Sequence, residues 1–282
     1  MNNDITAQIR YEAEKRNLKE STIRAYCNGT KYFLKTIGKD IQSLSMDDAE
    51  AFLTHKRLSG ISAQTYNYYH SAVRFFYKHV LKQIWDNEDI PRMKIDRSLP
   101  VVLSREEILS IIDHTDNLKH KAIIATMYSA GLRVSEVVHL HYNDISRSNK
   151  TIYVRESKSR RDRYTILADK TLDLLTTYWF QSDRPTGVLF PSAWTGTYLE
   201  PGSVNQFFKK SAAKAGINKK VSCHCCRHSF ATHLFEDGVD IKYIQALLGH
   251  IDPRSTEVYI HVSNKSLLGI RSPYDLHKGG EA

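Results

Sequence analysis

The segment Cys223–His228 combines side chains that can transfer protons, bind phosphate or bind metal ions. If this segment is helical, His224 and Arg227 are three residues apart and lie on one face. A proton-transfer group then stands beside a guanidinium that can grip a phosphate with two hydrogen bonds. The pairing suits phosphoryl transfer, although a solvated basic start of a helix gives the same short pattern.

A zinc site is the rival interpretation of this segment, because Cys223, Cys226, His228 and His233 are four potential ligands. Structural zinc sites separate their two ligand pairs by about a dozen residues, so that the chain can fold around the ion. Here the pairs almost touch, which argues against a metal. Haem attachment is also disfavoured, since Arg227 rather than a histidine follows Cys226. We expect the cysteines to be small buried hydrophobes.

Three further residues lie in motifs of the same chemistry. Arg133 follows a predicted helix over 118–130, His250 ends a Leu-Leu-Gly-His motif, and Tyr259 comes downstream of it. A phenol with a pKa of about 10 is a poor nucleophile at neutral pH unless nearby cations favour the phenolate and a base accepts its proton. The chain has 16 tyrosines, so packing is the better expectation for any one of them taken alone.

Together and in this order, the motifs closely resemble those of the tyrosine recombinases, also called the phage integrase family. The resemblance covers nearly the whole chain and rests on Gly-Leu-Arg-x-x-Glu, a basic hairpin, His-x-x-Arg-His-Ser-Phe-Ala-Thr-His, Leu-Leu-Gly-His and the downstream tyrosine. Cys226 and Ile260 replace the leucine and threonine common in the family, and both changes should spare the chemistry. The short chain leaves no room for the arm-binding domain of some phage integrases, which favours a compact Xer, integron or transposon-associated type.

The resemblance implies a role for each site residue. The catalytic positions are Arg133, Lys158, His224, Arg227, His250 and Tyr259, with Glu136 in support. The two arginines would grip the scissile phosphate, the lysine would protonate the leaving 5′ oxygen and the tyrosine would be the nucleophile. The first histidine would transfer a proton, the second would support phosphate and tyrosine, and the glutamate would orient its neighbours. Serines replace the glycines that usually flank the lysine, so a purely electrostatic role for this turn stays open.

The net charge fits a polyanionic partner. Lys and Arg total 40 against 31 Asp and Glu, which gives +9, and both the first 96 residues and the remainder are positive. Neutralising phosphates releases counterions and supplies affinity for nucleic acid, whereas the plainer interpretation of a basic chain is solubility. The basic residues that we expect to bind DNA are Arg160, Arg161, Arg163, Arg74 and Lys78.

Hydrophobic spacing and capping residues predict a mainly helical protein with a small β-sheet. Apolar residues at steps of three and four predict helices over 21–38, 45–60 and 62–80. Tyrosines on the third of these helices could stack on bases, but a stripe at helical spacing is more often core. A capping box at Ser104–Glu107 opens a second helical region. The runs 151–154 and 164–167 predict a hairpin, followed by helices over 172–180, 203–215, 224–235 and 241–248.

The segment 87–103 lacks periodicity and contains Pro91 and Pro100, which marks a linker. With the resemblance, we expect a helical SAM-like core DNA-binding domain at 1–90, a linker at 91–100, and an α/β catalytic domain at 101–282. In the family the C-terminal segment docks on a neighbouring protomer. Leu267, Leu268 and Ile270 are suitable anchors for that contact, or for packing within the same chain.

The implied function is site-specific DNA recombination: integration, excision or resolution of a DNA element. Tyr259 would attack a phosphodiester, forming a 3′-phosphotyrosyl bond and a free 5′ hydroxyl that attacks the partner duplex. Four protomers on two duplexes with paired core sites would exchange strands through a Holliday junction. The phosphotyrosyl bond conserves the energy of the cleaved phosphodiester bond, so no metal or other cofactor is expected. The sequence does not indicate which accessory proteins, if any, take part.

Two other functions remain alternatives: a type IB topoisomerase-like enzyme with the same chemistry, and a catalytically idle DNA-binding regulator. The intact set of catalytic positions disfavours the idle module. No run of 18 apolar residues and no secretion signal occur, and the few bunched cysteines fit a reducing compartment. We therefore expect a cytoplasmic, nucleoid-associated protein with no membrane contact.

Overall fold

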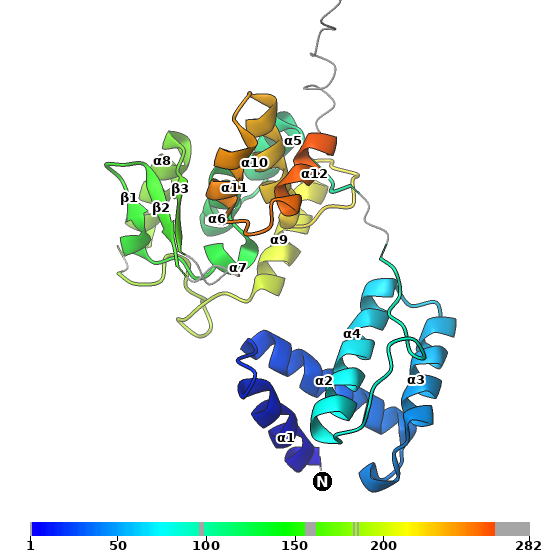
Figure 1. Cartoon of the computed structure of the whole chain (residues 1–282). Coiled ribbons are helices and arrows are strands. Elements are labelled where there is room, and N and C mark those ends of the chain that lie inside the picture. Colours follow the sequence, from blue (N-terminus) through cyan, green and yellow to red (C-terminus); the bar gives the residue numbers. More distant parts are fainter. Residues whose placement is uncertain (1, 96–98, 156–161, 183, 185, 263–282) are drawn as a thin grey trace, which may run out of the picture. The chain divides into compact units, whose positions relative to one another are not determined.

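The computed structural model describes residues 2–95, 99–155, 162–182, 184 and 186–262, with the side chains of residues 4–259 within these ranges (Figure 1). The chain forms two compact units, Met1–Arg97 and Ser98–Ala282. Both units are mostly helical, and the second contains a small sheet, which confirms the predicted fold class. Among the described helices, none is long and apolar enough to cross a membrane.

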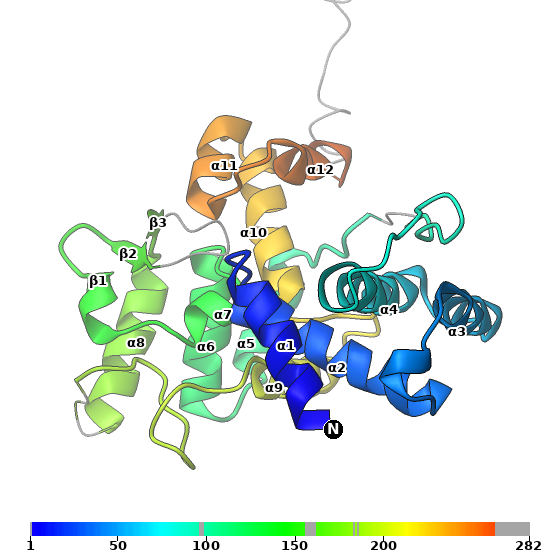
Figure 2. The same ribbon diagram turned by 60° about the horizontal axis from the view of Figure 1, so that its bottom comes forward.

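The first unit is a helical bundle. Its helices are α1 (Asn2–Glu14), α2 (Glu20–Ile37), α3 (Met46–Leu58) and α4 (Ala63–Phe75), with a 3₁₀ turn at Ile41–Ser43 and a π-helical turn at Phe76–Val80. The helix α2 packs against α1, α3 and α4, as Figure 2 shows. At Gly29 the contact with α4 is so close that an added Cβ would lie 2.5 Å from Ala72 Cβ. The helix α1 was not predicted from the sequence.

Local signals explain where these helices begin and end. Gly38 ends α2 in the left-handed conformation (φ 67°), and Ser45 and Asp48 form a capping box at the start of α3. Ser62 caps α4 by accepting a hydrogen bond from the Thr65 amide. The aromatic stripe of this helix faces the core, because Tyr66 is buried in the cluster that also contains the side chains of α1–α3.

The segment 90–93 packs on the first unit. The Tyr66 hydroxyl donates to the Pro91 carbonyl at 3.1 Å, and Asn67 bonds both the amide and the carbonyl of Met93 at 3.0 and 2.8 Å. Ile90 is buried in the core of this unit. The predicted linker therefore begins with residues that are fixed to α4, because the side chains of Tyr66 and Asn67 bind their backbone.

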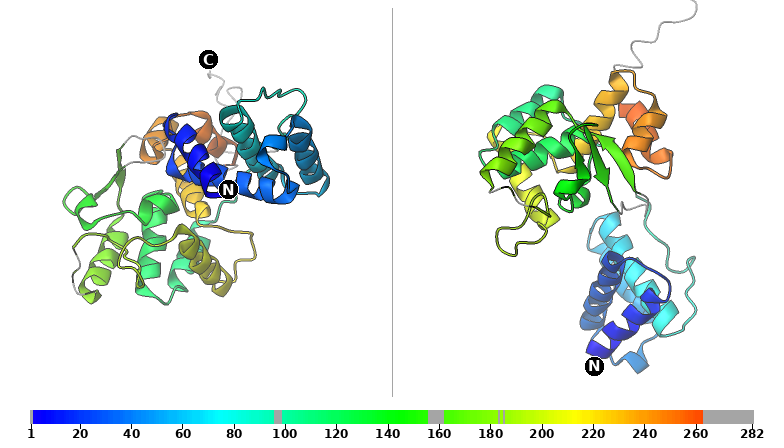
Figure 3. Two further views of the ribbon diagram at one scale, coloured as in Figure 1. Left: turned by 90° about the horizontal axis from the view of Figure 1, so that it is seen from below. Right: turned by 90° about the vertical axis from the view of Figure 1, so that its left-hand side faces the viewer.

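The second unit combines helices with one antiparallel sheet. Its elements are α5 (Arg105–Asp113), α6 (Leu118–Ser129), α7 (Val134–Val137), β1 (Ile145–Ser146), β2 (Thr151–Val154), β3 (Arg163–Ile166), α8 (Asp169–Gln181), α9 (Pro201–Lys214), α10 (His224–Glu236), α11 (Ile241–Leu248) and α12 (Arg254–Val262). The strand order is β1-β2-β3, and β2 pairs with β3 so that Tyr153 faces Tyr164. Figure 3 (right) shows the strands lying side by side. The sequence predicted this hairpin but not β1.

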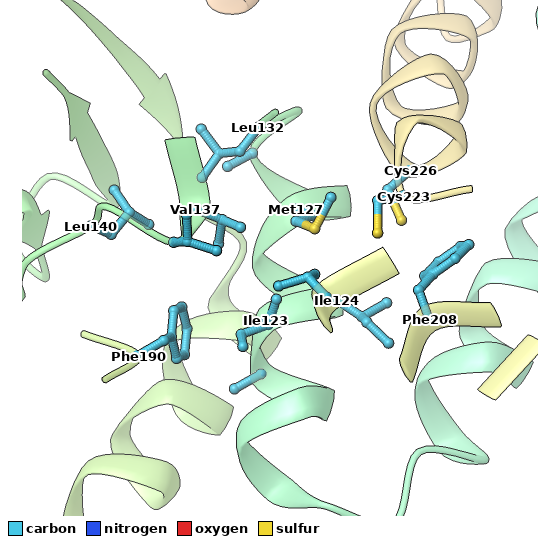
Figure 4. Close-up of a cluster of buried hydrophobic side chains, with 14 of the residues drawn as sticks. Ile123, Ile124, Met127, Leu132, Val137, Leu140, Phe190, Phe208, Cys223 and Cys226 are labelled. Atoms are coloured by element: carbon cyan, nitrogen blue, oxygen red, sulfur yellow. The ribbon is translucent and has the colours of Figure 1, made fainter. Parts of the chain in front are cut away.

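The core of this unit surrounds α6 (Figure 4). Cys223 and Cys226 are buried in it near Phe208, so the cysteines are packed as small hydrophobes, as predicted. Burial raises the pKa of Cys223 to about 12, which keeps the thiol protonated at neutral pH. The described part of the chain contains no cluster of three or more histidine, cysteine, aspartate or glutamate side chains that could hold a metal ion.

Candidate active site

Glu136 lies at the centre of the site and contacts three arginines. It stands on α7, the short helix that follows α6 through a turn at Gly131. Its carboxylate accepts bonds from the backbone amide of Arg133 at 2.9 Å and from Arg133 Nη1 at 2.7 Å. From β3, Arg163 donates both Nη groups to the two carboxylate oxygens, at 3.0 and 2.8 Å. Nη1 of Arg227 lies 3.6 Å from Glu136 Oε2.

Arg227 is buried, and its guanidinium is fixed by backbone groups. Nη1 donates to the Gly131 carbonyl at 2.8 Å, and Nη2 donates to the Leu248 carbonyl at 2.6 Å. These carbonyls belong to the turns that follow α6 and end α11. One side chain on α10 therefore joins two distant segments of the site, because the planar guanidinium presents several donors in a fixed geometry.

Two glycines permit this close approach of backbone and side chains. Gly131 has φ +62°, and a Cβ there would lie 2.4 Å from the Phe230 ring. Gly249 ends α11 with φ +64°, and a Cβ there would lie 2.7 Å from Arg163 Cδ. Left-handed backbone and the lack of space both require glycine at these positions. The glycines of Gly-Leu-Arg and Leu-Leu-Gly-His are thus part of the site.

The electrostatic balance favours a bound anion. Burial alone would raise the pKa of Glu136, but its bonds to Arg163 and the nearby Arg133 and Arg227 lower it to about 2. Burial and the neighbouring Arg133 lower the pKa of Arg227 to about 9, which still leaves it a cation at neutral pH. Three guanidiniums thus face one carboxylate, and the excess positive charge suits a phosphate.

His250 is held in one orientation by α12. Its Nδ1 lies 2.8 Å from the hydroxyl of the buried Thr256, and its carbonyl accepts a bond from Gln245. Burial, followed by the charges of Arg227 and Arg133, lowers the pKa of His250 to about 3. The imidazole is therefore neutral at physiological pH. In the tautomer whose Nδ1 accepts the Thr256 proton, Nε2 carries the hydrogen and can donate to a ligand.

Tyr259 lies on α12 and is 1% exposed. Its ring packs among apolar side chains of α10 and α11, including Phe230, Ile244 and Leu248. Its hydroxyl is 3.2 Å from Nδ1 of His228. Burial raises the pKa of this phenol, whereas the nearby Arg227 and Arg133 oppose that shift. The phenol is thus a neutral group at the edge of a cationic cluster.

A hollow of about 390 Å³ adjoins these residues. It is lined by Asp162, Arg163, Lys242, Gln245, Ala246, Gly249, His250 and Ile251. Basic and amide side chains of α11 meet the start of β3 there. This surface gives a polyanion room beside His250.

The structure brings together most of the predicted catalytic residues. Arg133, Arg227 and His250 meet around Glu136, and the charges of Arg133 and Arg227 act on Tyr259. His224 is the exposed first residue of α10, one turn from Arg227. Figure 2 shows α10 leading to α11 and α12. Lys158, Arg160 and Arg161 lie outside the described residues.

Arg163 is placed differently from the expectation of a DNA contact. Its side chain is 7% exposed, bonds Glu136 with both Nη groups, and donates Nε to the Leu247 carbonyl at 2.7 Å. Three of its N–H groups are therefore engaged within the protein. Arg163 is thus a group that fixes Glu136 and the end of α11, a role that the sequence did not indicate.

Two further residues of the site were not identified from the sequence. The sequence indicates His228 only as a potential zinc ligand and carries no signal for Thr256. The available signal for His228 was its position four residues after His224 in one helix, which places both on one face. That signal did not indicate that Tyr259 is its partner, since this contact joins α10 to α12.

The expected DNA-binding residues of the first unit border a second, smaller hollow of about 230 Å³. Arg74, Lys78 and Arg92 line it together with His70 and Ser71. Arg92 donates to the Ser71 hydroxyl at 2.8 Å. Nε of Arg74 is buried, with no hydrogen-bond partner among the described residues. The hollow thus gathers three cationic side chains.

The chain matches two family models. The model of the phage integrase family matches residues 102–266, and that of the phage integrase N-terminal SAM-like domain matches residues 5–87. The chain belongs to the phage integrase family. This confirms the resemblance found in the sequence, including the SAM-like character of the helical first unit.

Curated relatives and a solved structure agree with this assignment. The tyrosine recombinase XerA of Pyrococcus horikoshii is 33% identical over 95% of this chain and 92% of its own length. The tyrosine recombinase XerD of Caulobacter vibrioides is 33% identical over 92% and 91%. A crystal structure of XerH bound to palindromic difH substrate is similar in fold, with a TM-score of 0.70 at 20% identity over 96% of this chain and 85% of that one. The chain is a tyrosine recombinase, an enzyme of site-specific recombination that cleaves and rejoins DNA.

The charge of Glu136 gives the recombinase a defined pH dependence of stability. The pKa of about 2 in the fold lies below the usual 4.5, so ionised Glu136 stabilises the fold above pH 4.5 and this stabilisation is lost as the pH falls toward 2. The shift corresponds to about 3 kcal/mol. We expect Glu136→Gln to lower the free energy of unfolding at pH 7, with a gap to the wild type that narrows below pH 4.5. Urea denaturation of the full chain between pH 7 and pH 3 measures this.

Asp173→Asn is the matched control, because Asp173 is an exposed carboxylate of the same unit. It should leave the free energy of unfolding near the wild-type value. The charged role of Glu136 would be contradicted if the difference in free energy of unfolding between Glu136→Gln and the wild type stayed constant from pH 7 to pH 3.

Proposed function

We propose that Tyr259 is the nucleophile of the recombination reaction and that Arg133, Arg227 and His250 bind the scissile phosphate. The supporting observation is that these groups, drawn from four separate segments, gather around Glu136 next to the Tyr259 ring. The phenolic oxygen attacks the phosphorus and forms a 3′-phosphotyrosyl bond, while the 5′ oxygen leaves. The freed 5′ hydroxyl then attacks the phosphotyrosyl bond of the partner duplex through a Holliday junction.

The proposed phosphate site stabilises charge that develops during the attack. The arginines are held by backbone carbonyls and by Glu136, so they do not need to reorganise when charge builds up on the phosphate. His250 adds a neutral donor through Nε2. A phosphate beside Tyr259 brings the guanidiniums and the phenol to one centre, where cations favour loss of the phenolic proton.

Lys158 is the proposed acid that protonates the leaving 5′ oxygen, and His224 is the proposed proton-transfer residue that accepts the phenolic proton of Tyr259. Lys158 belongs to the connection between β2 and β3. Side chains at the described ends of this connection form hydrogen bonds and an ion pair. Tyr153 donates to Asp162 at 2.6 Å, and Arg155 pairs with the buried Asp144 at 2.6 Å. Because Arg163 follows Asp162 and binds Glu136, the same strand that carries this connection contacts the proposed phosphate site.

The first unit is the proposed core DNA-binding domain, and residues 101–282 are the proposed catalytic domain. Arg74 and Lys78 border a hollow that a backbone phosphate can enter. In the reaction we propose four protomers on two duplexes with paired core sites, joined through the C-terminal segment. The enzyme would act in the cytoplasm at the DNA that it recombines.

Tyr259→Phe tests the nucleophile. The variant should bind DNA as the wild type does and form no covalent adduct, because phenylalanine keeps the ring but lacks the attacking oxygen. The measurement is adduct formation on nicked suicide duplexes drawn from the native locus. Tyr243→Phe is the control, because Tyr243 is an exposed residue of α11, and this variant should retain adducts. Adducts that persist in Tyr259→Phe would place the nucleophile elsewhere.

Arg227→Lys tests the phosphate clamp. An ammonium cannot hold the Gly131 and Leu248 carbonyls and a phosphate in one plane, so we expect the single-turnover cleavage rate to fall by roughly a hundredfold or more. Arg105→Lys is the control, since Arg105 pairs with Asp237 at the surface of the same unit. Near-normal cleavage by Arg227→Lys would remove this residue from the clamp.

Arg74→Ala tests the basic hollow of the first unit. Loss of one phosphate contact should weaken DNA binding and reduce the slope of log K against log salt by about 0.9. Fluorescence anisotropy with duplex DNA at several salt concentrations measures the slope. Lys15→Ala, at an exposed lysine outside the hollow, should leave the slope unchanged. An unchanged slope in Arg74→Ala would show that this hollow holds no phosphate.

A further inference from the structure

His228 makes the hydrogen bond that the described structure records for the Tyr259 hydroxyl. The two side chains come from α10 and α12, with Nδ1 and Oη 3.2 Å apart and ring centroids 5.9 Å apart. Neither the catalytic set implied by the family motifs nor the phosphate clamp includes His228. Its neighbours in sequence, His224 and Arg227, belong to those groups, so it lies inside the site and not at its periphery.

The charge state of the imidazole allows this hydrogen bond to run from the phenol to the ring. Burial, with the charges of His224 and Arg227, lowers the pKa of His228 to about 4, so the ring is neutral at physiological pH. A neutral ring has one bare nitrogen, which can accept a proton from a hydroxyl. When Nδ1 is that nitrogen, the Tyr259 hydroxyl donates to it at 3.2 Å, and the lone pairs of Oη are left for an electrophile.

We propose that His228 is a positioning residue for the nucleophile: it accepts the Tyr259 hydrogen and thereby fixes the direction in which Oη presents its lone pairs to the scissile phosphate. The proposal rests on the proposed role of Tyr259. A buried hydroxyl among apolar side chains rotates toward whatever acceptor is present. Without His228, the hydroxyl loses this acceptor, and the direction of its lone pairs is no longer fixed.

The contact also has a purely structural interpretation, in which a buried pair only stabilises the packing of α12 on α10. The same helix provides the matched control for that possibility. Nδ1 of His233 lies 2.9 Å from the hydroxyl of Tyr128, so it makes the same type of bond from α10 to a tyrosine of α6. His233→Leu and His228→Leu thus remove equivalent bonds, and only one of them involves Tyr259.

The experiment compares four variants of the full chain: His228→Leu, His228→Asn, His233→Leu and Tyr259→Phe. Asparagine can place Oδ1 where histidine has Nδ1, which restores an acceptor. We expect His228→Leu to reduce single-turnover adduct formation on the nicked duplex by roughly 10- to 100-fold, with DNA affinity unchanged. His228→Asn should recover most of that loss, and His233→Leu should react at nearly the wild-type rate even if its melting temperature falls.

A substrate with a 5′-bridging sulfur at the cleavage site separates the two sides of the reaction. A thiolate leaves without being protonated, so this substrate relieves defects in leaving-group protonation but not defects in the nucleophile. The His228→Leu defect should therefore be equally large on the sulfur and oxygen substrates. A defect that disappears with sulfur would overturn the proposal, because His228 would then act on the leaving group.

Four further results decide the outcome. Equal slowing of His228→Leu and His233→Leu would overturn the proposal in favour of packing, and wild-type rates in His228→Leu would overturn it directly. His228→Asn as slow as His228→Leu would also overturn it, since an acceptor would then not suffice. Adducts formed by Tyr259→Phe would instead refute the proposed nucleophile, which distinguishes failure of the function from failure of this inference.

Discussion

The bond network of Glu136 is the interaction on which the site depends. Three guanidiniums from the turn after α6, from β3 and from α10 would repel one another if they were gathered without an anion. One buried carboxylate makes their assembly favourable, and it leaves positive charge over for a ligand. Removing one partner of such a buried set is costly because the remaining charges stay desolvated. The same carboxylate therefore holds the fold together locally and sets the polarity of the site.

Burial determines the protonation state of the other polar groups. His228 and His250 are neutral at physiological pH because their desolvation and the neighbouring arginines disfavour the imidazolium. A neutral histidine has one donor and one acceptor nitrogen. The hydroxyls of Tyr259 and Thr256 each contact Nδ1 of one of these rings. The cationic cluster thus keeps both histidines able to accept as well as donate a hydrogen bond.

Much of this arrangement could be predicted from the sequence. The capping residues Ser45 and Ser104 begin helices as expected, and Gly38 ends one, because these signals act within a few residues. Arg133 and Arg227 were identified by motifs whose glycines and spacing are local. The burial of Arg163 was not predicted, because a basic residue beside other basic residues looks like surface charge. Its partner Glu136 is 27 positions away, and only the pairing of β3 against α7 and α11 brings them together.

The helix α12 shows how Tyr259, the proposed nucleophile, is linked to the rest of the site. Thr256 and Tyr259 are three residues apart and share one face of this helix. Thr256 contacts His250 at the end of α11, and Tyr259 contacts His228 on α10. Two polar bonds from different segments thus set the rotation of α12, in addition to its apolar contacts with Ile244 and Leu248. Because His250 also belongs to the proposed phosphate site, a ligand that shifts this imidazole acts on Thr256 and hence on the orientation of the helix that carries Tyr259. Tyr259, the proposed nucleophile, and the proposed phosphate site are thus joined by a chain of contacts that runs through α12 and Thr256 to His250.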